Sequence, residues 1–198
     1  IQKKKIKRKP ANITNKDLII GINTGAGPRW PLKSLPIEKT IELIQKLNEE
    51  LNAKLILFGG PDEIERNNKI LSLSKAPIIN AGCGNYIFEL ASLISICDTI
   101  VTSDSLALHI SLALKRNVVT FFGQTAPQEI EMYNQGLKIF TPSDCIGCYS
   151  SYDGRIPTCM DGVHVKDLFK AVLDVRKQSL SIIILSKNLL ETEKTLKS

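Results

Sequence analysis

Short, continuous apolar runs alternate along the chain with longer segments in which apolar residues recur at helical spacing. Continuous runs rich in Ile, Leu and Val are typical of strands that are buried on both faces. The runs predict six strands, at residues 18–23, 54–58, 77–80, around 100–101, 117–122 and 137–140. The segments between them predict helices from Pro36 to about residue 51, from Asp62 to Leu73, from Ile87 to Ile96, from Ser105 to Leu114 and from near Val165.

This alternation predicts an α/β fold, a Rossmann-like, doubly wound parallel sheet of six strands. The commonest strand order of such a sheet is 3-2-1-4-5-6, which makes the first and fourth strands neighbours at the point where the order reverses. Ligands of these sheets bind beyond the carboxyl ends of the strands at that point. The loops after the first and fourth strands are therefore expected to face each other across one site.

The positive charge is concentrated at the start of the chain. The net charge is +6, and six of the 26 Lys and Arg residues fall between Lys3 and Lys9, which leaves 20 basic against 20 acidic residues elsewhere. We therefore expect a basic arm over residues 1–16, a folded domain over residues 17–175 and a helical tail over residues 176–198. Basic patches interleaved with aromatic residues are absent from the sequence, so no nucleic-acid partner is expected. A solvated linker is the simplest interpretation of the arm, and peripheral contact with an anionic membrane is the alternative.

The cysteines and the hydropathy indicate a cytoplasmic protein. No apolar run approaches the roughly 20 residues of a membrane span, and the charged start shows no signal-peptide pattern. Five cysteines are an odd number, which favours a reducing compartment. Cys145, Cys148 and Cys159, followed by His164, have the residue types of a zinc site, but a second C-x-x-C pair is missing. Reduced thiols or a local disulfide are therefore the favoured interpretation, and no metal site is predicted.

The stretch from Asp98 to His109 predicts a strand that passes directly into a helix. Ser103, Asp104 and Ser105 are residues that favour helix starts. The first turn of a helix presents unpaired N–H groups with a positive dipole, which suit an anion. His109 lies four residues after Ser105 and so falls on the same helix face. This stretch is therefore a candidate anion receptor.

A loop rich in glycine follows the first strand, with Thr24, Gly25, Ala26 and Gly27 in succession. It is neither a G-x-G-x-x-G dinucleotide fingerprint nor a P-loop. Lys33, just beyond the loop, could compensate the charge of a phosphate. Asp62 and Glu63 follow the second strand, where nucleotide-binding sheets often hold a ribose hydroxyl. These features at successive strand ends together favour a nucleotide-diphosphate site.

The ordered motifs N-T-G-A-G-P-R-W-P-L-K-S-L-P, L-F-G-G-P-D-E, D-S-L-A-L-H and F-F-G-Q-T-A-P resemble those of glycosyltransferase family 9, the ADP-heptose:lipopolysaccharide heptosyltransferases and their relatives. The resemblance spans about residues 18–172. It implies one half of a GT-B fold, the C-terminal domain that binds the nucleotide-sugar donor. It also implies a second, acceptor-binding domain and a catalytic carboxylate that these 198 residues do not include.

The resemblance implies a role for each motif residue. Lys33 corresponds to the lysine at the donor phosphate, and Glu63 or its neighbour Asp62 to the acid that holds the ribose. Asp104 and Ser105 correspond to the diphosphate and sugar contacts, and His109 to the histidine that ends the motif. The substrate-binding set expected on this basis is Thr24, Gly25, Ala26, Gly27, Lys33, Asp62, Glu63, Asp104, Ser105, Leu106 and His109.

His109 and Lys33 are the expected catalytic residues. Departure of the leaving group places negative charge on the β-phosphate, which helix N–H groups, Lys33 and a donor His109 would stabilise. This arrangement requires no cofactor and no metal. The sequence departs from the family at Leu106, where glycine is usual, and at Leu35, where tryptophan is frequent.

The function that the resemblance implies is binding of the donor, an ADP-heptose-like sugar nucleotide, in a glycosyltransferase of lipopolysaccharide core or related glycan synthesis. The acceptor would be lipid-linked or a lipopolysaccharide, bound through the other domain, so the isolated chain is expected to bind nucleotide but not to transfer sugar. A cytoplasmic location at the inner face of the inner membrane would suit that role. Two alternatives are a non-catalytic nucleotide-binding module and a nucleotide-sugar epimerase on the same architecture.

Overall fold

The computed structural model describes residues 13–14, 16–140, 146–149 and 158–178. Its centre is a six-stranded sheet in which every neighbouring pair is parallel, in the order β3-β2-β1-β4-β5-β6. The strands are β1 (Ile19–Asn23), β2 (Lys54–Phe58), β3 (Ile78–Asn80), β4 (Thr99–Ser103), β5 (Asn117–Phe121) and β6 (Gly136–Ile139). Both the predicted fold and the predicted strand order are confirmed.

The first strand lies at the centre of the sheet and joins its two halves. β1 pairs with β2 on one side and with β4 on the other, where Gly21 lies opposite Ile100. Asp98 extends this second pairing, because its backbone N–H donates to the Ile19 oxygen and its carboxylate accepts the Ile19 N–H, each at 2.8 Å. A Cβ atom on Gly21 would lie 2.5 Å from the Ile100 side chain and 2.6 Å from Phe58. The centre of the sheet therefore has no room for a side chain at this position.

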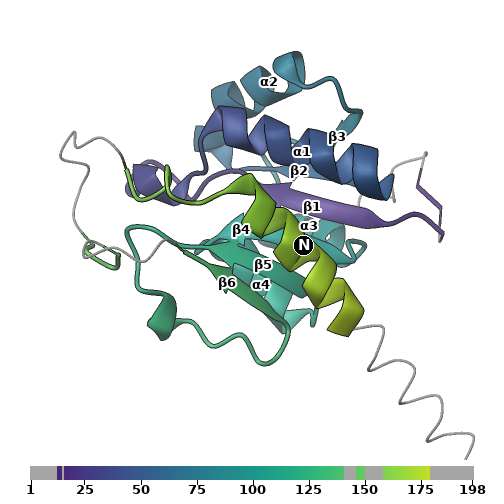
Figure 1. The fold of residues 1–198 in the computed structure, drawn as a ribbon. Helices are drawn as coiled ribbons and strands as arrows, with labels where there is room; N and C mark the ends of the chain where they lie inside the picture. Colours follow the sequence, from purple (N-terminus) through teal and green to yellow (C-terminus); the bar gives the residue numbers. More distant parts are fainter. Residues whose placement is uncertain (1–12, 15, 141–145, 150–157, 179–198) are drawn as a thin grey trace, which may run out of the picture.

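Helices cover both faces of the sheet (Figure 1). α1 (Ile37–Leu51), α2 (Ile64–Leu73) and a helix over residues 165–178 pack in one hydrophobic cluster with β1 and β2. α3 (Ile87–Ile94) and α4 (Leu106–Ala113) pack on the opposite face, in a cluster with Ile19, Phe58 and Ile100. The core is therefore divided by the sheet into two apolar layers, as a doubly wound fold requires.

Three short 3-10 helices follow the carboxyl ends of strands. They are η1 (Pro31–Lys33), η2 (Pro61–Glu63) and η3 (Pro127–Glu129), and each has proline near its start. Proline fixes φ at a helical value and lacks an N–H, so it suits the first turn. The sequence predicted α2 from Asp62, whereas η2 precedes it and α2 begins at Ile64. Through these short turns, Lys33 and Glu63 lie over the carboxyl ends of the central strands.

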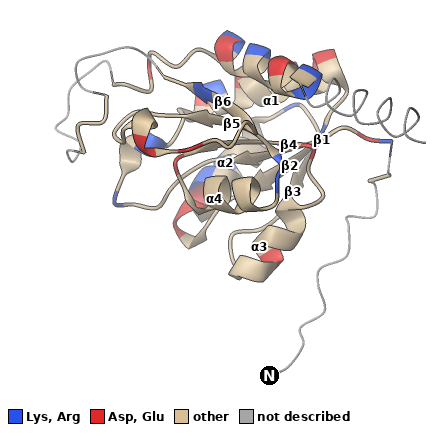
Figure 2. Cartoon of the chain, turned by 90° about the horizontal axis from the view of Figure 1, so that it is seen from below, with Lys and Arg blue, Asp and Glu red and all other residues tan. Residues whose placement is uncertain are grey.

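Charge is unevenly distributed over the helices. α1 carries acidic and basic residues on its outer face, whereas α3 contains a single Glu and α4 no Asp, Glu, Lys or Arg (Figure 2).

At the start of α3, Tyr86, Ile87 and Phe88 are 68%, 53% and 83% exposed. No helix among the described residues is both long and apolar enough to cross a bilayer.

The proposed domain limits stay predictions. Residues 1–12 of the basic arm and residues 179–198 of the tail lie outside the described part of the chain. Residues 176–178 continue the helix that begins at residue 165, so the folded unit runs slightly past the expected limit at 175.

Candidate functional site

A pocket of about 480 Å³ lies beyond the carboxyl ends of β1, β2 and β4, at the point where the strand order reverses. Three loops supply most of its wall: Gly25 to Gly27 after β1, Gly59 to Glu63 after β2, and Asp104 to Ala107 after β4. The loops after the first and fourth strands thus face each other, as the sequence predicts. The location is the usual one for ligands of doubly wound sheets.

Ten of the eleven residues predicted to bind substrate line this pocket. They are Gly25, Ala26, Gly27, Lys33, Asp62, Glu63, Asp104, Ser105, Leu106 and His109. Their roles toward a donor stay predictions. The eleventh, Thr24, is 2% exposed and is not a lining residue. Its hydroxyl donates to Asn67 Oδ1 at 2.6 Å, which turns the side chain into the protein.

Lys33, Asp104 and His109 form a row of polar groups along one side of the pocket. The Lys33 ammonium donates to Asp104 Oδ2 at 2.8 Å and to the Asp104 carbonyl at 3.0 Å. On the other side of the carboxylate, His109 Nε2 lies 3.8 Å from Asp104 Oδ1. Lys33 is 9% exposed, and the His109 side chain is 59% exposed. Asp104 therefore holds the lysine in place and leaves the imidazole open to the pocket.

The first turn of α4 reaches the pocket without a side-chain cap. Ser105 occupies the N-cap position, but its hydroxyl lies 2.9 Å from Thr102 Oγ1 and accepts from Asn23 Nδ2 at 3.2 Å. Leu106 and Ala107, the first two helical residues, line the pocket, and Leu106 is 54% exposed. Uncapped N–H groups at a helix start are suited to an anion.

Glu63 stands on the opposite side of the pocket and contacts two loops. Its Oε1 accepts the Gly27 N–H at 3.0 Å, and its Oε2 accepts the Gly60 N–H at 2.7 Å. The side chain is 8% exposed, whereas its neighbour Asp62 is exposed in the same pocket. The sequence leaves the ribose role open between these two acids, and the geometry gives them different surroundings.

Several residues of the site were not predicted from the sequence. Asn23, Asn85 and Leu90 line the pocket, and Asn67 lies beneath it at 1% exposure. Asn23 Nδ2 donates to the Gly25 carbonyl at 2.8 Å and so shapes the glycine loop. An asparagine at the end of an apolar strand was the available signal for Asn23. Asn67 had no such signal, because it lies within a polar helical segment.

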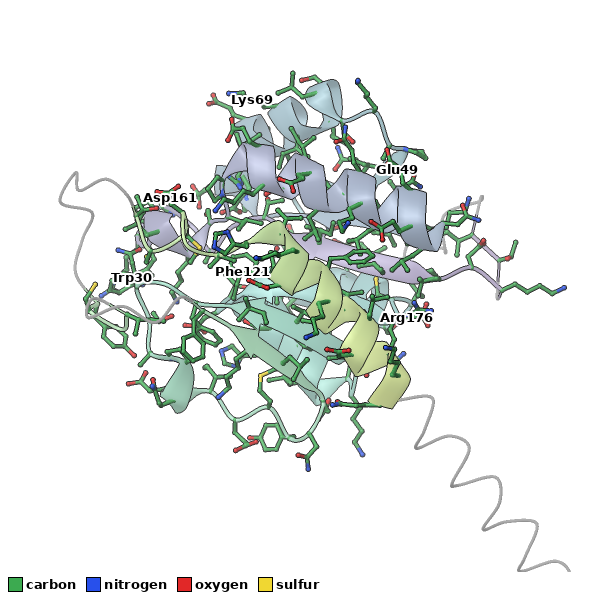
Figure 3. The ribbon with its side chains drawn as sticks, viewed as in Figure 1. Trp30, Glu49, Lys69, Phe121, Asp161 and Arg176 are labelled. Carbon is green, nitrogen blue, oxygen red and sulfur yellow. The ribbon has the colours of Figure 1, made fainter. Side chains whose placement is uncertain are left out.

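An aromatic pair lies beside the lysine, at the end of the sheet opposite Arg176 (Figure 3). Trp30 and Tyr149 pack edge to face with their ring centroids 6.3 Å apart, and Lys33 Nζ lies 5.9 Å from the Trp30 centroid. The Tyr149 hydroxyl donates to Glu129, and this hydrogen bond raises the pKa of Tyr149. The contact connects the segment 146–149 to η3.

The cysteine cluster cannot be assembled from the described residues. Cys145 lies outside them, Cys148 is exposed and Cys159 is half-buried near Gly123. Within the part of the chain that the structure covers, no three His, Cys, Asp or Glu side chains are grouped as a metal site would require. The choice between zinc and thiols at Cys145, Cys148, Cys159 and His164 stays a prediction.

The fold is a Rossmann-like domain with a pocket at the switch point of its parallel sheet. Residues 1–151 match glycosyltransferase family 9 (heptosyltransferase). The chain therefore belongs to glycosyltransferase family 9. The match covers the four motifs from which the sequence resemblance was drawn.

The relatives support the same assignment. The chain is 30% identical over 111 residues to lipopolysaccharide heptosyltransferase 2 of Escherichia coli (strain K12), a region that covers 54% of this chain and 30% of that protein. The structure of E. coli ADP-heptose lps heptosyltransferase II aligns with a TM-score of 0.69 at 23% identity, over 85% of this chain and 49% of the other. The glycosyl transferase family 9 structure from Veillonella parvula DSM 2008 gives 0.67 at 22% identity, over 82% and 47%. These two likenesses show the fold, and the chain spans about half the length of both solved proteins.

Proposed function

We propose that this chain is the donor-binding domain of a glycosyltransferase and that its pocket takes a nucleoside diphosphate sugar of the ADP-heptose type. The observation that carries the proposal is the division of the pocket into two chemically different sides. Lys33, His109 and the uncapped start of α4 form a side suited to a diphosphate. Asp62 and Glu63 form a side suited to ribose hydroxyls.

The same arrangement supports catalytic roles for His109 and Lys33. As the glycosidic bond to the donor phosphate breaks, negative charge develops on the β-phosphate oxygens. A positive ammonium, an imidazole that donates a hydrogen bond and helix N–H groups stabilise that charge more in the transition state than in the ground state. Asp104 holds Lys33 ready, and the lysine can share its protons between this carboxylate and a phosphate. No cofactor or metal takes part in this scheme.

The acceptor is proposed to be lipid-linked or a lipopolysaccharide, bound by a further domain in the cytoplasm at the inner face of the inner membrane. The acceptor part of this proposal is supported by the family match, which is to heptosyltransferases, and by the E. coli relative, which is named a lipopolysaccharide heptosyltransferase. Because the chain spans about half of the solved relatives, we expect it to bind nucleotide but not to transfer sugar when isolated. Sustained sugar transfer by the purified chain would refute that expectation.

Thermal denaturation with nucleotides tests the donor proposal. A ligand that binds only the folded state stabilises it by RT ln(1 + [L]/Kd), about 2.7 kcal/mol at a concentration of 100 Kd. We expect ADP and ADP-sugars to raise the melting temperature, and UDP at the same concentration to have a much smaller effect. The matched control is Lys33→Met, which removes the ammonium from the pocket and should reduce the shift with ADP. Absence of any shift with either nucleotide would contradict the proposal.

A further inference from the structure

We propose that Glu63 and Asn67, four residues apart where η2 passes into α2, are positioning residues that fix the glycine loops after β1 and β2 relative to each other before a ligand binds. The ligand is a nucleotide only if the donor proposal holds. The positioning role itself concerns the ligand-free protein and can be tested there.

Glu63 joins the two loops through both of its carboxylate oxygens. Oε1 accepts the N–H of Gly27 in the first loop, at 3.0 Å, and Oε2 accepts the N–H of Gly60 in the second, at 2.7 Å. Hydrogen bonds from backbone N–H groups to a carboxylate are stronger than neutral ones. Because the side chain is 8% exposed, water has little access to replace it. One carboxylate therefore determines the separation of the two loops.

The glycine at position 25 makes room for this carboxylate. A Cβ atom there would lie 2.5 Å from Glu63 Oε1, closer than real contacts allow. Gly25 has no need of the left-handed backbone conformation, in contrast to Gly27 with φ of 78°. The requirement for glycine at position 25 is thus one of space. The first loop and Glu63 fit together only if this position lacks a side chain.

Asn67 extends the same connection into the protein interior. Its Oδ1 accepts from the Thr24 hydroxyl at 2.6 Å, and its Nδ2 donates to the Phe58 carbonyl at 3.1 Å. The same Nδ2 lies 3.5 Å from Cys83 Sγ, beyond the end of β3. Asn67 therefore connects the ends of three adjacent strands, and this explains how Thr24 can matter to the pocket without lining it.

Amide hydrogen exchange on the ligand-free protein tests the positioning role directly. In Glu63→Gln, one carboxylate oxygen becomes an NH2 group that cannot accept from a backbone N–H. We expect exchange at Gly27 or Gly60 to become about tenfold faster or more, as the loss of one hydrogen bond to a charged group predicts. Exchange in β4 and β5 should be unchanged. Glu65→Gln is the matched control, because Glu65 is an exposed acid of the first turn of α2 that does not line the pocket. Unchanged exchange at both glycines in Glu63→Gln would overturn the proposal.

Nucleotide binding distinguishes a positioning residue from a simple ribose contact. ADP and 2′,3′-dideoxyadenosine diphosphate differ only in the hydroxyls that a ribose-binding acid would contact. If Glu63 positions the loops, Glu63→Gln weakens both ligands by a similar factor, about tenfold. If it acts only on ribose, the variant weakens ADP and leaves the dideoxy ligand unaffected, which would count against the proposal. If the wild-type chain binds neither ligand, the donor proposal fails, and the exchange experiment still decides the positioning role.

Gly25→Ala provides an independent variant in which Glu63 is retained. The added methyl group must displace the carboxylate, so exchange at Gly27 or Gly60 should rise as in Glu63→Gln. The double variant should then exchange little faster than either single one, because both disrupt the same contacts. Additive effects of the two substitutions would contradict the proposal. Should Glu63→Gln fail to fold, Gly25→Ala and Glu63→Asp, in which the shorter side chain cannot span both loops, carry the same test.

Discussion

At the scale of single residues, side chains of the pocket contact each other in ways that the spacing of the motifs does not predict. Lys33 and Asp104 are 71 positions apart and meet at 2.8 Å, with side chains only 11% and 15% exposed. The sequence indicated both as contacts of an anionic ligand. Their opposite charges neutralise each other, so the site carries less positive charge than the residue types suggest.

Lys33→Met removes one member of this pair and leaves the Asp104 carboxylate without its ammonium. We expect a loss of about 1–3 kcal/mol in the free energy of unfolding, measured with urea. Lys69→Met, at an exposed position of α2 (Figure 3), should change it by less than about 0.5 kcal/mol. Equal effects of the two substitutions would show that the Lys33 contact is not stabilising.

Leu106 lines the pocket at the position where the sequence resemblance leads us to expect glycine. Its side chain is 54% exposed at the first position of α4, directly before the helix N–H groups. We expect Leu106→Gly to increase the affinity for an ADP-sugar relative to ADP by about three- to tenfold, since it opens the approach to those groups. Calorimetric titration with both ligands measures the ratio, and Leu106→Ala should give an intermediate value. A ratio that stays constant would assign the sugar to another part of the cleft.

At the scale of helices and strands, the connections between elements depend on single side chains as much as on packing. Lys39 on α1 is the clearest case among the described residues. Its ammonium donates to the carbonyls of Met160, Asp161 and Val163, at 3.1, 2.5 and 2.8 Å. These residues form the turn before the helix over residues 165–178. One lysine therefore attaches that helix to α1.

Lys39→Met leaves three carbonyl groups without their donor. We expect the free energy of unfolding to fall by about 1–3 kcal/mol and amides of residues 165–178 to exchange faster than those of the sheet. Lys46→Met on the same helix is the control. The Lys46 ammonium has an exposed partner in Glu50 and lies 4.8 Å from the Phe169 ring, so the cost should stay below about 1 kcal/mol. A smaller loss for Lys39→Met than for Lys46→Met would contradict this account.

The end of α4 contains a backbone conformation that lysine disfavours. Lys115 follows the helix with φ of 55°, a value that suits glycine. We expect Lys115→Gly to raise the free energy of unfolding by about 0.5–1 kcal/mol, because the left-handed cost of a Cβ exceeds the entropic cost of glycine. Lys115→Ala keeps the Cβ and should not stabilise. Chemical denaturation of the three proteins measures the difference.

The elements themselves were predictable, and the contacts between them were not. Continuous apolar runs predicted all six strands, most clearly β1, β2, β4 and β5, which are buried along almost their whole length and carry no polar face. The strand order was predicted from the commonest arrangement of such sheets, and the pairing of β1 with β4 confirms it. Asn67 and Lys39, by contrast, look like ordinary polar helix residues. Their partners are backbone carbonyls and a threonine hydroxyl brought near by the fold, and no residue pattern encodes those distances.

At the scale of the whole molecule, two cysteines differ in exposure, one inside the apolar layer beneath α3 and α4 and the other in the loop after β3. Cys97 is 0% exposed in the layer beneath α3 and α4, and burial raises its pKa. Cys83 is half-buried at the end of β3, and desolvation raises its pKa as well. A raised pKa lowers the fraction of reactive thiolate at neutral pH. Modification of Cys83 therefore requires only a small local opening of the structure, whereas modification of Cys97 requires the apolar layer around it to unfold.

We expect a maleimide to modify Cys83 slowly in the native protein and Cys97 only at urea concentrations that unfold the domain. Mass spectrometry of the labelled peptides separates the two sites, and Cys83→Ser provides the control. Labelling of Cys97 at the same rate as Cys83 in the absence of urea would show that the layer between the sheet and α3 and α4 opens locally.

The pairing of β1 with β4 also bears on how the chain folds. Ile19 and Asp98 are 79 positions apart, whereas each of the other strand pairings joins segments that are much closer in sequence. Closing so long a loop costs the most chain entropy, and pairings of this kind limit folding rates. The pocket spans that junction, so we expect it to appear only after the two halves of the sheet have joined. Nucleotide binding during refolding would then record the final assembly of the sheet.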